Sequence, residues 1–274
     1  MRILTAILII SSLGSLAKPI HLQYQFNNDS LFLRMLKELN FQDLNTTSIS
    51  RLNAGQKLDS LMHFGLKNGW GENDFENEKN LPKGVLYTKS SDNKIHAFTW
   101  AVPLEKGSYQ FFGQLLLRKK NKFRVQGLRN ISDFNEFDAL TQNKWPGGLI
   151  YHIQTNHFRR KSQYLAFTFR PNGDSMQIKT VEPIIVGLKN IYFGASVFKV
   201  KKFNGQYFSK PPVRLILRYS SSVTASIRSG SKSSEIFIDR LGPMHGGLKN
   251  NYADFGPTLA KDILIFKRGK WLIK

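Results

Sequence analysis

Residues 80–107, NLPKGVLYTKSSDNKIHAFTWAVPLEKG, contain two apolar runs separated by a polar turn. The first run covers residues 84–87 and the second covers residues 95–102. Short runs of aliphatic and aromatic residues on either side of a Ser-Ser-Asp-Asn turn predict a β-hairpin. Lys83 then stands at the mouth of the first strand, and Leu81 lies two residues before it.

The same strand signals continue to the C-terminus. Alternating apolar residues of β-branched or aromatic type, bounded by Gly, Pro, Asn and Ser clusters, predict further strands. The final segment, DILIFKRGKWLIK, predicts a hairpin that turns at residues 267–269. The predicted strands cover residues 83–88, 94–102, 109–118, 122–127, 147–154, 163–170, 176–180, 213–219, 223–228 and 234–238.

Four segments predict helices. Residues 30–40, SLFLRMLKELN, have one mostly apolar face and a serine that can cap the start. The other three helices are expected within residues 43–62, 131–142 and 183–196. The fold class predicted from this mixture is α/β (mixed α+β). A division near residue 128 gives two halves, 18–128 and 129–274, each with sheet and helix.

The charge balance is strongly basic. Forty Lys and Arg residues stand against nineteen Asp and Glu, which gives a formal charge of +21 and a pI near 10.1. The 41% hydrophobic content of the 274 residues is that of a folded globular protein, not of a disordered chain. Such a surface attracts polyanions, which include nucleic acid, anionic membrane and sulfated glycans.

The N-terminus predicts export. Residues 1–17 carry an early positive charge at Arg2, a short apolar stretch and a small-x-small pattern at 15–17, as a secretory signal peptide does. That stretch is too short to span a bilayer, and no later one is apolar enough, so we expect a secreted or lysosomal protein with no membrane span. The chain has no cysteine, which excludes disulfides and thiolate sites. Candidate glycosylation sequons start at Asn28, Asn45 and Asn130.

Four basic clusters interleave Lys or Arg with aromatic residues. They occupy residues 118–124, 157–161, 198–208 and 266–271. Lysine and arginine neutralise phosphates, and an aromatic ring stacks on an exposed base, so together the clusters favour nucleic acid over other polyanions. The expected DNA contacts are Arg118, Lys119, Lys120, Lys122, Arg124, Lys199, Lys201 and Lys202.

Established catalytic motifs are absent from the sequence. It contains no His-Glu-x-x-His, no phosphate-binding loop and no Gly-x-Ser-x-Gly. Of the six histidines, we expect His63 and His96 to be packed residues, and His152 and His157 to lie at a turn or on the surface.

Three segments resemble the deoxyribonuclease II (acid DNase) family in order along the chain. They are KGVLYTKSSDNKIHAFTWAVP, FGASVFKVKKFNGQYFSKPPVRLILRYSSS and DILIFKRGKWLIK, within residues 60–274. The resemblance implies a phospholipase-D-like fold of two similar halves, each a sheet flanked by helices. It also implies metal-independent cleavage of DNA at acid pH, with no cofactor, by one His-x-Lys motif from each half. One histidine attacks phosphorus, the other protonates the leaving oxygen, and the lysines hold the phosphate.

The chain departs from this family at both motifs. Leu81 replaces the first histidine and leaves Lys83 as a phosphate-holding remnant, while Phe255 and Pro257 stand where the second histidine and lysine are expected. A displaced pair, His245 and Lys249, is the candidate for residual catalysis.

Three functions therefore remain open. The first is a catalytically degenerate, secreted DNase II-like protein that binds DNA or another polyanion through Lys83 and the basic clusters. The second is an active acid endonuclease that uses His245. The third is a secreted interaction protein that binds a protein or a glycan. The sequence does not decide the oligomeric state.

Overall fold

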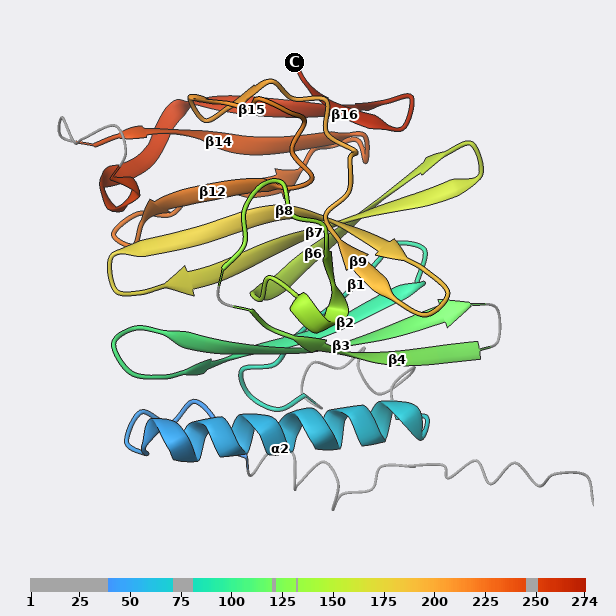
Figure 1. Ribbon diagram of the computed structural model, residues 1–274, viewed down its shortest axis with the longest axis vertical. Helices are drawn as coiled ribbons and strands as arrows, with labels where there is room; N and C mark the ends of the chain where they lie inside the picture. Colours follow the sequence, from blue (N-terminus) through green and yellow to red (C-terminus); the bar gives the residue numbers. More distant parts are fainter. Residues whose placement is uncertain (1–38, 71–80, 120–121, 132, 245–250) are drawn as a thin grey trace, which may run out of the picture.

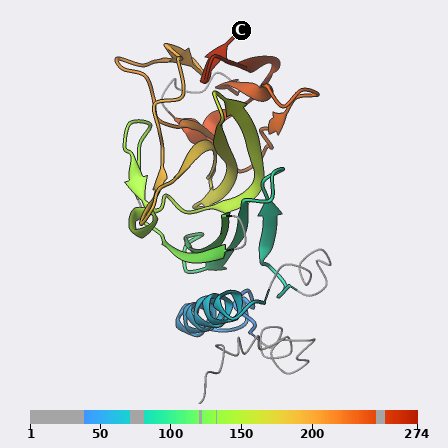
Figure 2. The same ribbon diagram turned by 90° about the vertical axis from the view of Figure 1, so that its right-hand side faces the viewer.

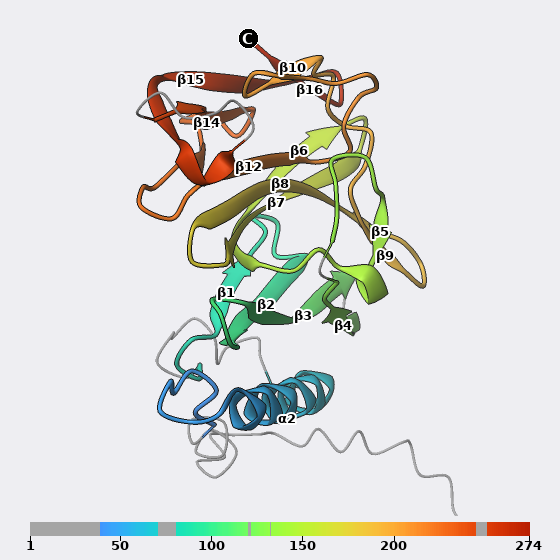
Figure 3. The same ribbon diagram turned by 60° about the vertical axis from the view of Figure 1, so that its left-hand side comes forward.

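The computed structural model describes residues 39–70, 81–119, 122–131, 133–244 and 251–274. The predicted signal peptide, nearly all of the predicted helix at 30–40, Asn28, Lys120, His245 and Lys249 lie outside these residues. The described chain forms layers (Figures 1 and 3). A helix covers the outer face of a first sheet, a second sheet lies in the middle, and a third sheet lies at the opposite end.

The first sheet is antiparallel with strand order β1-β2-β3-β4. Its strands are β1 (Leu86–Lys89), β2 (Ile95–Pro103), β3 (Tyr109–Lys119) and β4 (Lys122–Arg129). The hairpin predicted within residues 80–107 supplies β1 and β2. Residues 95–102 of β2 are all buried, because the strand is covered on both faces. Phe98 and Trp100 pack toward the helix, whereas Ala97 and Ala101 pack toward the middle sheet.

Helix α2 (Ser48–Lys67) packs across the first sheet. Thr47 caps its start by accepting a hydrogen bond from the backbone N–H of Ser50. Leu58, Met62 and Leu66 recur at four-residue spacing and are buried against the sheet. At Gly55 the helix comes so close to β2 that a Cβ atom would lie 2.5 Å from the Val102 side chain. The sequence placed this helix at 43–62, about one turn too early.

The middle sheet has strand order β5-β9-β8-β7-β6, and β12 also pairs with β8. Trp145 and Ile150 pack against Phe111 and Leu115 of the first sheet. The division near residue 128 falls at the end of β4, yet residues from both sides of it share this core. The elements are β5 (Leu140–Thr141), the 3-10 turn η2 (Gln142–Lys144), β6 (Leu149–Phe158), β7 (Lys161–Asn172), β8 (Met176–Val186), β9 (Ile191–Phe193) and β12 (Leu215–Ser220).

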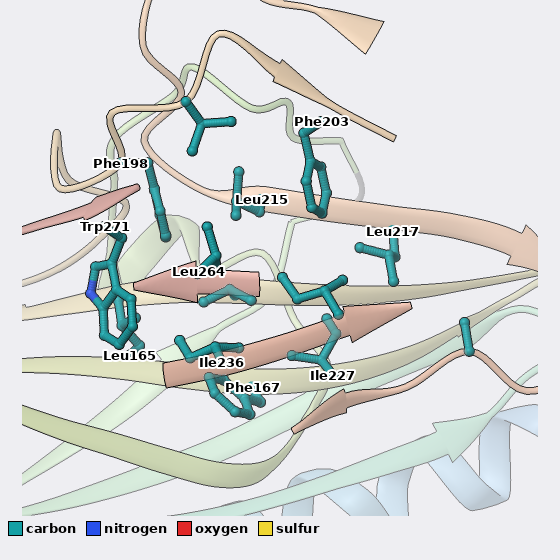
Figure 4. Packing of buried hydrophobic residues seen from close by; sticks show 14 of the residues in the cluster. Leu165, Phe167, Phe198, Phe203, Leu215, Leu217, Ile227, Ile236, Leu264 and Trp271 are labelled. Carbon is teal, nitrogen blue, oxygen red and sulfur yellow. The ribbon is translucent and has the colours of Figure 1, made fainter. Parts of the chain in front are cut away.

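The third sheet has strand order β13-β14-β15-β16 and closes the other face of the middle sheet. Figure 4 shows the core between the two sheets, where Ile236, Leu264 and Trp271 meet Leu165 and Phe167 of β7. The strands are β13 (Ile227–Ser229), β14 (Glu235–Pro243), β15 (Phe255–Lys267) and β16 (Lys270–Ile273), with the 3-10 turn η3 (Tyr252–Asp254) before β15 and a small hairpin of β10 (Lys202–Phe203) and β11 (Gln206–Tyr207).

The predicted α/β (mixed α+β), phospholipase-D-like fold of two similar halves is wrong. The described strands pair antiparallel within their sheets, and neighbouring strands are mostly joined by hairpins. Within the described ranges, α2 is the single α-helix, and it covers the first sheet only. A sheet flanked by helices is therefore not repeated in the second half of the chain.

The predicted helices at 131–142 and 183–196 are wrong for local reasons. In the first segment, residues 136–137 form a turn, and tertiary bonds hold it in place: Arg218 pairs with Glu136 at 2.6 Å, and Arg214 donates to the carbonyl of Asn135. In the second, residues 184–186 continue β8 and residues 191–193 form β9. Pro183 begins that segment, and Gly194 has φ +90°, a backbone angle that helices exclude.

Candidate functional site

A basic pocket of about 480 Å³ lies where β3 ends and β4 begins. Lys94, Arg118, Lys119, Lys122 and Arg124 line it, and none of its described lining residues is acidic. Its other lining side chains are Ile95, Leu117, Phe123, Tyr164, Val186 and Leu188. Four of the five predicted contacts in the 118–124 cluster are thus brought together, and Lys120 lies outside the described residues.

Strand pairing explains how the pocket is built. Arg118 stands opposite Phe123, and its guanidinium carbon lies 5.7 Å from the centre of that ring. Leu117, opposite Arg124, is buried toward the middle sheet. Arg124 Nη1 donates to the carbonyl of Leu188 and ties β4 to the turn between β8 and β9. Its Nη2 is buried without a hydrogen-bond partner.

Asp92, in the turn between β1 and β2, binds two side chains that line the pocket, those of Tyr164 and Lys94. Its Oδ2 accepts a 2.9 Å hydrogen bond from Tyr164 and pairs with Lys94 Nζ at 3.2 Å. Burial raises the pKa of Asp92, but hydrogen bonds from Ser90, Tyr164 and Lys94 outweigh that effect and lower its pKa overall. Burial raises the pKa of Tyr164 to about 12, so the phenol keeps the proton that it donates. The carboxylate is therefore engaged with its protein neighbours.

Two further basic clusters meet at hairpin tips. Arg159, Arg160 and Lys161 form the tip of β6–β7, and Lys267, Arg268 and Lys270 form the tip of β15–β16. Gly269 has φ +79°, and a Cβ there would lie 2.8 Å from the Phe158 ring. Gln163 holds the tips together: its Oε1 accepts from Trp271 Nε1 at 2.8 Å, and its Nε2 donates to the carbonyl of Gly269 at 3.3 Å.

The pocket and the two tips lie on one side of the molecule. In Figure 1, β3 ends on the same side to which the β6–β7 and β15–β16 hairpins point, and Figure 2 turns this side toward the viewer. Tyr164 of β7 connects the two regions, because it lines the pocket and lies three residues from Lys161. We call this surface the basic face: Lys94, Arg118, Lys119, Lys122, Arg124, Arg159, Arg160, Lys161, Lys267, Arg268 and Lys270.

The predicted contacts Lys199, Lys201 and Lys202 are exposed. The backbone N–H of Lys199 donates to the carbonyl of Trp271 in β16, at 2.8 Å. Lys202 Nζ lies 4.8 Å from the centre of the Tyr207 ring. This segment therefore borders the third sheet and is not part of the pocket.

The positions implied by the DNase II resemblance do not share a cleft. Lys83 is exposed and lines a cavity of about 650 Å³ with residues 39–44. Leu81 is buried in the core beneath α2, whereas Phe255 is buried in the core between the middle and third sheets. A site formed by these two positions is not present in the described residues.

Another cavity, of about 430 Å³, lies between α2 and β4. The buried side chain of Gln114 bridges two titratable groups of this cavity: Nε2 donates to Asp59 at 2.7 Å, and Oε1 accepts from His63 Nδ1 at 3.0 Å. Burial raises the pKa of Asp59, and Gln114, His63 and Arg129 offset this only in part. The sequence indicated His63 as a packed residue and gave no sign of Asp59.

The other expected histidines lie in strands. His96 is buried and bonds to the Tyr87 hydroxyl at 2.8 Å, in agreement with a packed role. His152 and His157 belong to β6, not to a turn, and His157 is exposed there, as predicted. His152 Nε2 lies 2.8 Å from Ser229 Oγ, and that hydroxyl also bonds to Gln154.

The two described sequons differ in accessibility. Asn45 is exposed. Asn130 is partly buried, and its Nδ2 donates to the carbonyls of Ile131 and Pro146 at 2.6 and 3.2 Å.

The described residues contain neither a metal-binding cluster nor a membrane-spanning helix. No cluster of three or more His, Asp or Glu side chains there is placed to hold a metal ion. No helix in the same residues is long and apolar enough to cross a bilayer.

The sequence missed the walls that complete the pocket. Tyr164 and Leu188 are remote from the 118–124 cluster in sequence, and only sheet packing brings them to it. Comparison with known proteins adds no assignment: no family model matches the chain, and neither a curated protein nor a solved structure matches it.

Proposed function

We propose that this protein binds nucleic acid through the basic face. The observation that carries the proposal is the convergence of the β3–β4, β6–β7 and β15–β16 clusters on one side of the molecule. Separate basic segments become a continuous positive surface only if the fold brings them together. A chain of phosphates contacts such a surface at several points and releases counterions at each one.

The charges of this face are largely available to a ligand. Lys119, Lys122, Arg159 and Arg160 are exposed, and none of them has a described ion pair. The nearby carboxylate of Asp92 is engaged by Tyr164, Lys94 and Ser90. The field at the pocket is therefore positive, which attracts an anionic polymer.

Salt titration tests this proposal. A labelled single-stranded oligonucleotide is titrated with protein at several salt concentrations, and affinity is read by fluorescence anisotropy. We expect log K to fall linearly with log salt, with a slope of about −0.7 per phosphate contact. Lys119→Gln with Lys122→Gln should make the slope shallower by about 1.4.

The matched control is Lys57→Gln with Lys67→Gln, two exposed lysines of α2, on the outer side of the first sheet. This variant has the same net charge as the pocket variant and should keep the wild-type slope. Equal losses in both double variants would contradict a defined face. Binding to heparin without binding to the oligonucleotide would contradict nucleic acid as the ligand and favour a glycan.

We include the absence of the family's DNA cleavage in the proposal, because Leu81 and Phe255, the positions that the resemblance assigns to the catalytic pair, lie in separate cores of this fold. Plasmid DNA incubated near pH 5 with EDTA should stay intact. Nicking that His245→Ala abolishes would show instead an active acid endonuclease.

A further inference from the structure

The cavity between α2 and β4 brings a carboxyl group, an imidazole and a guanidinium group together. Asp59 and His63 stand four residues apart on α2, so they lie on the same face of the helix. Arg129 faces α2 from β4, because it pairs with Phe112, whose ring packs in the core beneath the helix. Arg129 is exposed at the mouth, and the three polar side chains line one cavity.

Gln114 fixes how the two helix side chains face the cavity. Its amide donates to Asp59 Oδ1 and accepts from His63 Nδ1. Because Nδ1 carries the hydrogen of that bond, Nε2 of the neutral imidazole has a free lone pair. Within the described residues, neither this Nε2 nor Asp59 Oδ2 has a hydrogen-bond partner, and neither atom is fully buried. The cavity therefore offers two neighbouring acceptors, held in place by one amide.

The protein compensates the charge of Asp59 only in part. Burial raises the pKa of Asp59 despite Gln114, His63 and Arg129. A ligand cation that reached Oδ2 would complete the compensation, since an opposite charge nearby favours the ionised carboxyl group. A protein with a formal charge of +21 disfavours a bare cation, so the ligand needs a negative group as well. Arg129, at the mouth, is placed to bind that group.

A glycine of β4 leaves room for the ligand. Gly127 stands opposite Gln114 in the sheet, and a Cβ atom there would lie 3.3 Å from Gln114 Nε2. A larger side chain at this position would occupy the space in front of the amide. The cavity has a volume of about 430 Å³, within the range of small-molecule sites.

We propose that this cavity binds a free amino acid, whose ammonium group donates to Asp59 Oδ2 and His63 Nε2 and whose carboxylate accepts from Arg129. The inference goes beyond nucleic-acid binding, and the cavity shares no lining residue with the basic pocket. An ammonium group combines three donors with a positive charge, which a hydroxyl group does not. A ligand with only one of the two charged groups leaves either Asp59 or Arg129 without its counter-charge.

Isothermal titration calorimetry with glycine tests the proposal, because glycine carries the two charged groups and no side chain. Its halves are the control ligands: methylammonium has no carboxylate, and acetate has no ammonium group. Loss of a hydrogen bond to a charged group weakens binding by at least about tenfold, so we expect each half to bind that much more weakly at matched salt. Glycerol, a polyol without charge, should also bind more weakly than glycine.

Three variants locate the site. Asp59→Asn keeps an oxygen that accepts from Gln114 but removes the charge, and should bind glycine at least about tenfold more weakly. Arg129→Gln and Gly127→Val should also lower the affinity, the second by filling the cavity without removing a polar group. Asp138→Asn, at an exposed carboxylate outside the cavity, has the same net charge as Asp59→Asn and should bind as the wild type does.

The outcomes separate this proposal from that for the basic face. The amino-acid site is wrong if glycine does not bind at millimolar concentrations, or if either half or glycerol binds as tightly as glycine. Wild-type affinity in Asp59→Asn would contradict it as well. The oligonucleotide titration reports on other residues and is not affected by these results. Circular dichroism of each variant checks the fold, and Asp59→Asn decides the question if Gly127→Val does not fold.

Discussion

Folding buries the side chain of Asp59, and burial disfavours the charged form of its carboxyl group. Burial between α2 and the first sheet raises its pKa, so the folded protein holds a proton at pH values where the unfolded chain has released it. Stability from this group is therefore greatest below the unfolded pKa and is lost as pH rises through the folded pKa. Gln114 needs only an acceptor oxygen from residue 59, whether or not the residue is charged.

Asp59→Asn should consequently be more stable than the wild type at pH 7. The amide oxygen still accepts from Gln114, and the cost of burying a charge is removed. Thermal unfolding at pH 7 and at pH 4 should show a higher Tm for the variant at pH 7 and a smaller gap at pH 4. Asp138→Asn, at an exposed carboxylate, is the control and should change neither value. A lower Tm for Asp59→Asn at pH 7 would mean that the charge stabilises the fold.

The sequons give a second prediction at this scale. If residues 1–17 direct export, Asn45 should carry a glycan, because its side chain is exposed. Asn130 should stay unmodified in most molecules, because its amide nitrogen is held by two carbonyls. In protein secreted from eukaryotic cells, Asn45→Gln should remove a glycosidase-sensitive mass shift that Asn130→Gln leaves intact. The reverse pattern would contradict the accessibility argument.

At the scale of elements, strands were predictable and most helices were not. The strand predicted at 94–102 forms at Ile95–Pro103, and that at 109–118 forms at Tyr109–Lys119. Local periodicity and turn residues suffice for such hairpins, since each strand pairs with its sequence neighbour. The false helix at 131–142 is different, because Arg218 of strand β12 and Arg214, just before that strand, hold it from about eighty residues away. No local pattern contains that information.

The start of α2 can be tested directly. Thr47 accepts from the backbone N–H of Ser50, and loss of such a cap costs about 1 kcal/mol. Thr47→Ala should lower Tm by about 2–4 °C in protein made without glycosylation. Thr47→Ser keeps the hydroxyl and should stay close to the wild type. If both variants unfold at the same temperature, the cap contributes little and packing of Leu58 and Met62 fixes the helix alone.

At the scale of the whole molecule, the middle sheet explains why the site was only partly predictable. Its strand β7 packs Tyr164 and Ala166 toward the first sheet, and Leu165 and Phe167 toward the third. This double burial joins the three sheets and brings basic tips from distant parts of the chain to one side. The sequence identified the charges, including 118–124, but contained no local signal for their shared orientation.

Because the basic clusters lie on one side of the molecule, the effects of removing charges from two of them on the salt slope can be predicted. Lys119→Gln with Lys122→Gln alters the pocket, and Arg159→Gln with Arg160→Gln alters the β6–β7 tip. On an oligonucleotide long enough to reach both, the changes in salt slope should add, because the two places are separate contacts with one chain of phosphates. As the oligonucleotide is shortened, one double variant should lose its effect before the other, since a strand too short to reach both places contacts only one of them. If both variants weaken the shortest strand equally, the charges act only as a general field and the tips are not a path for the strand.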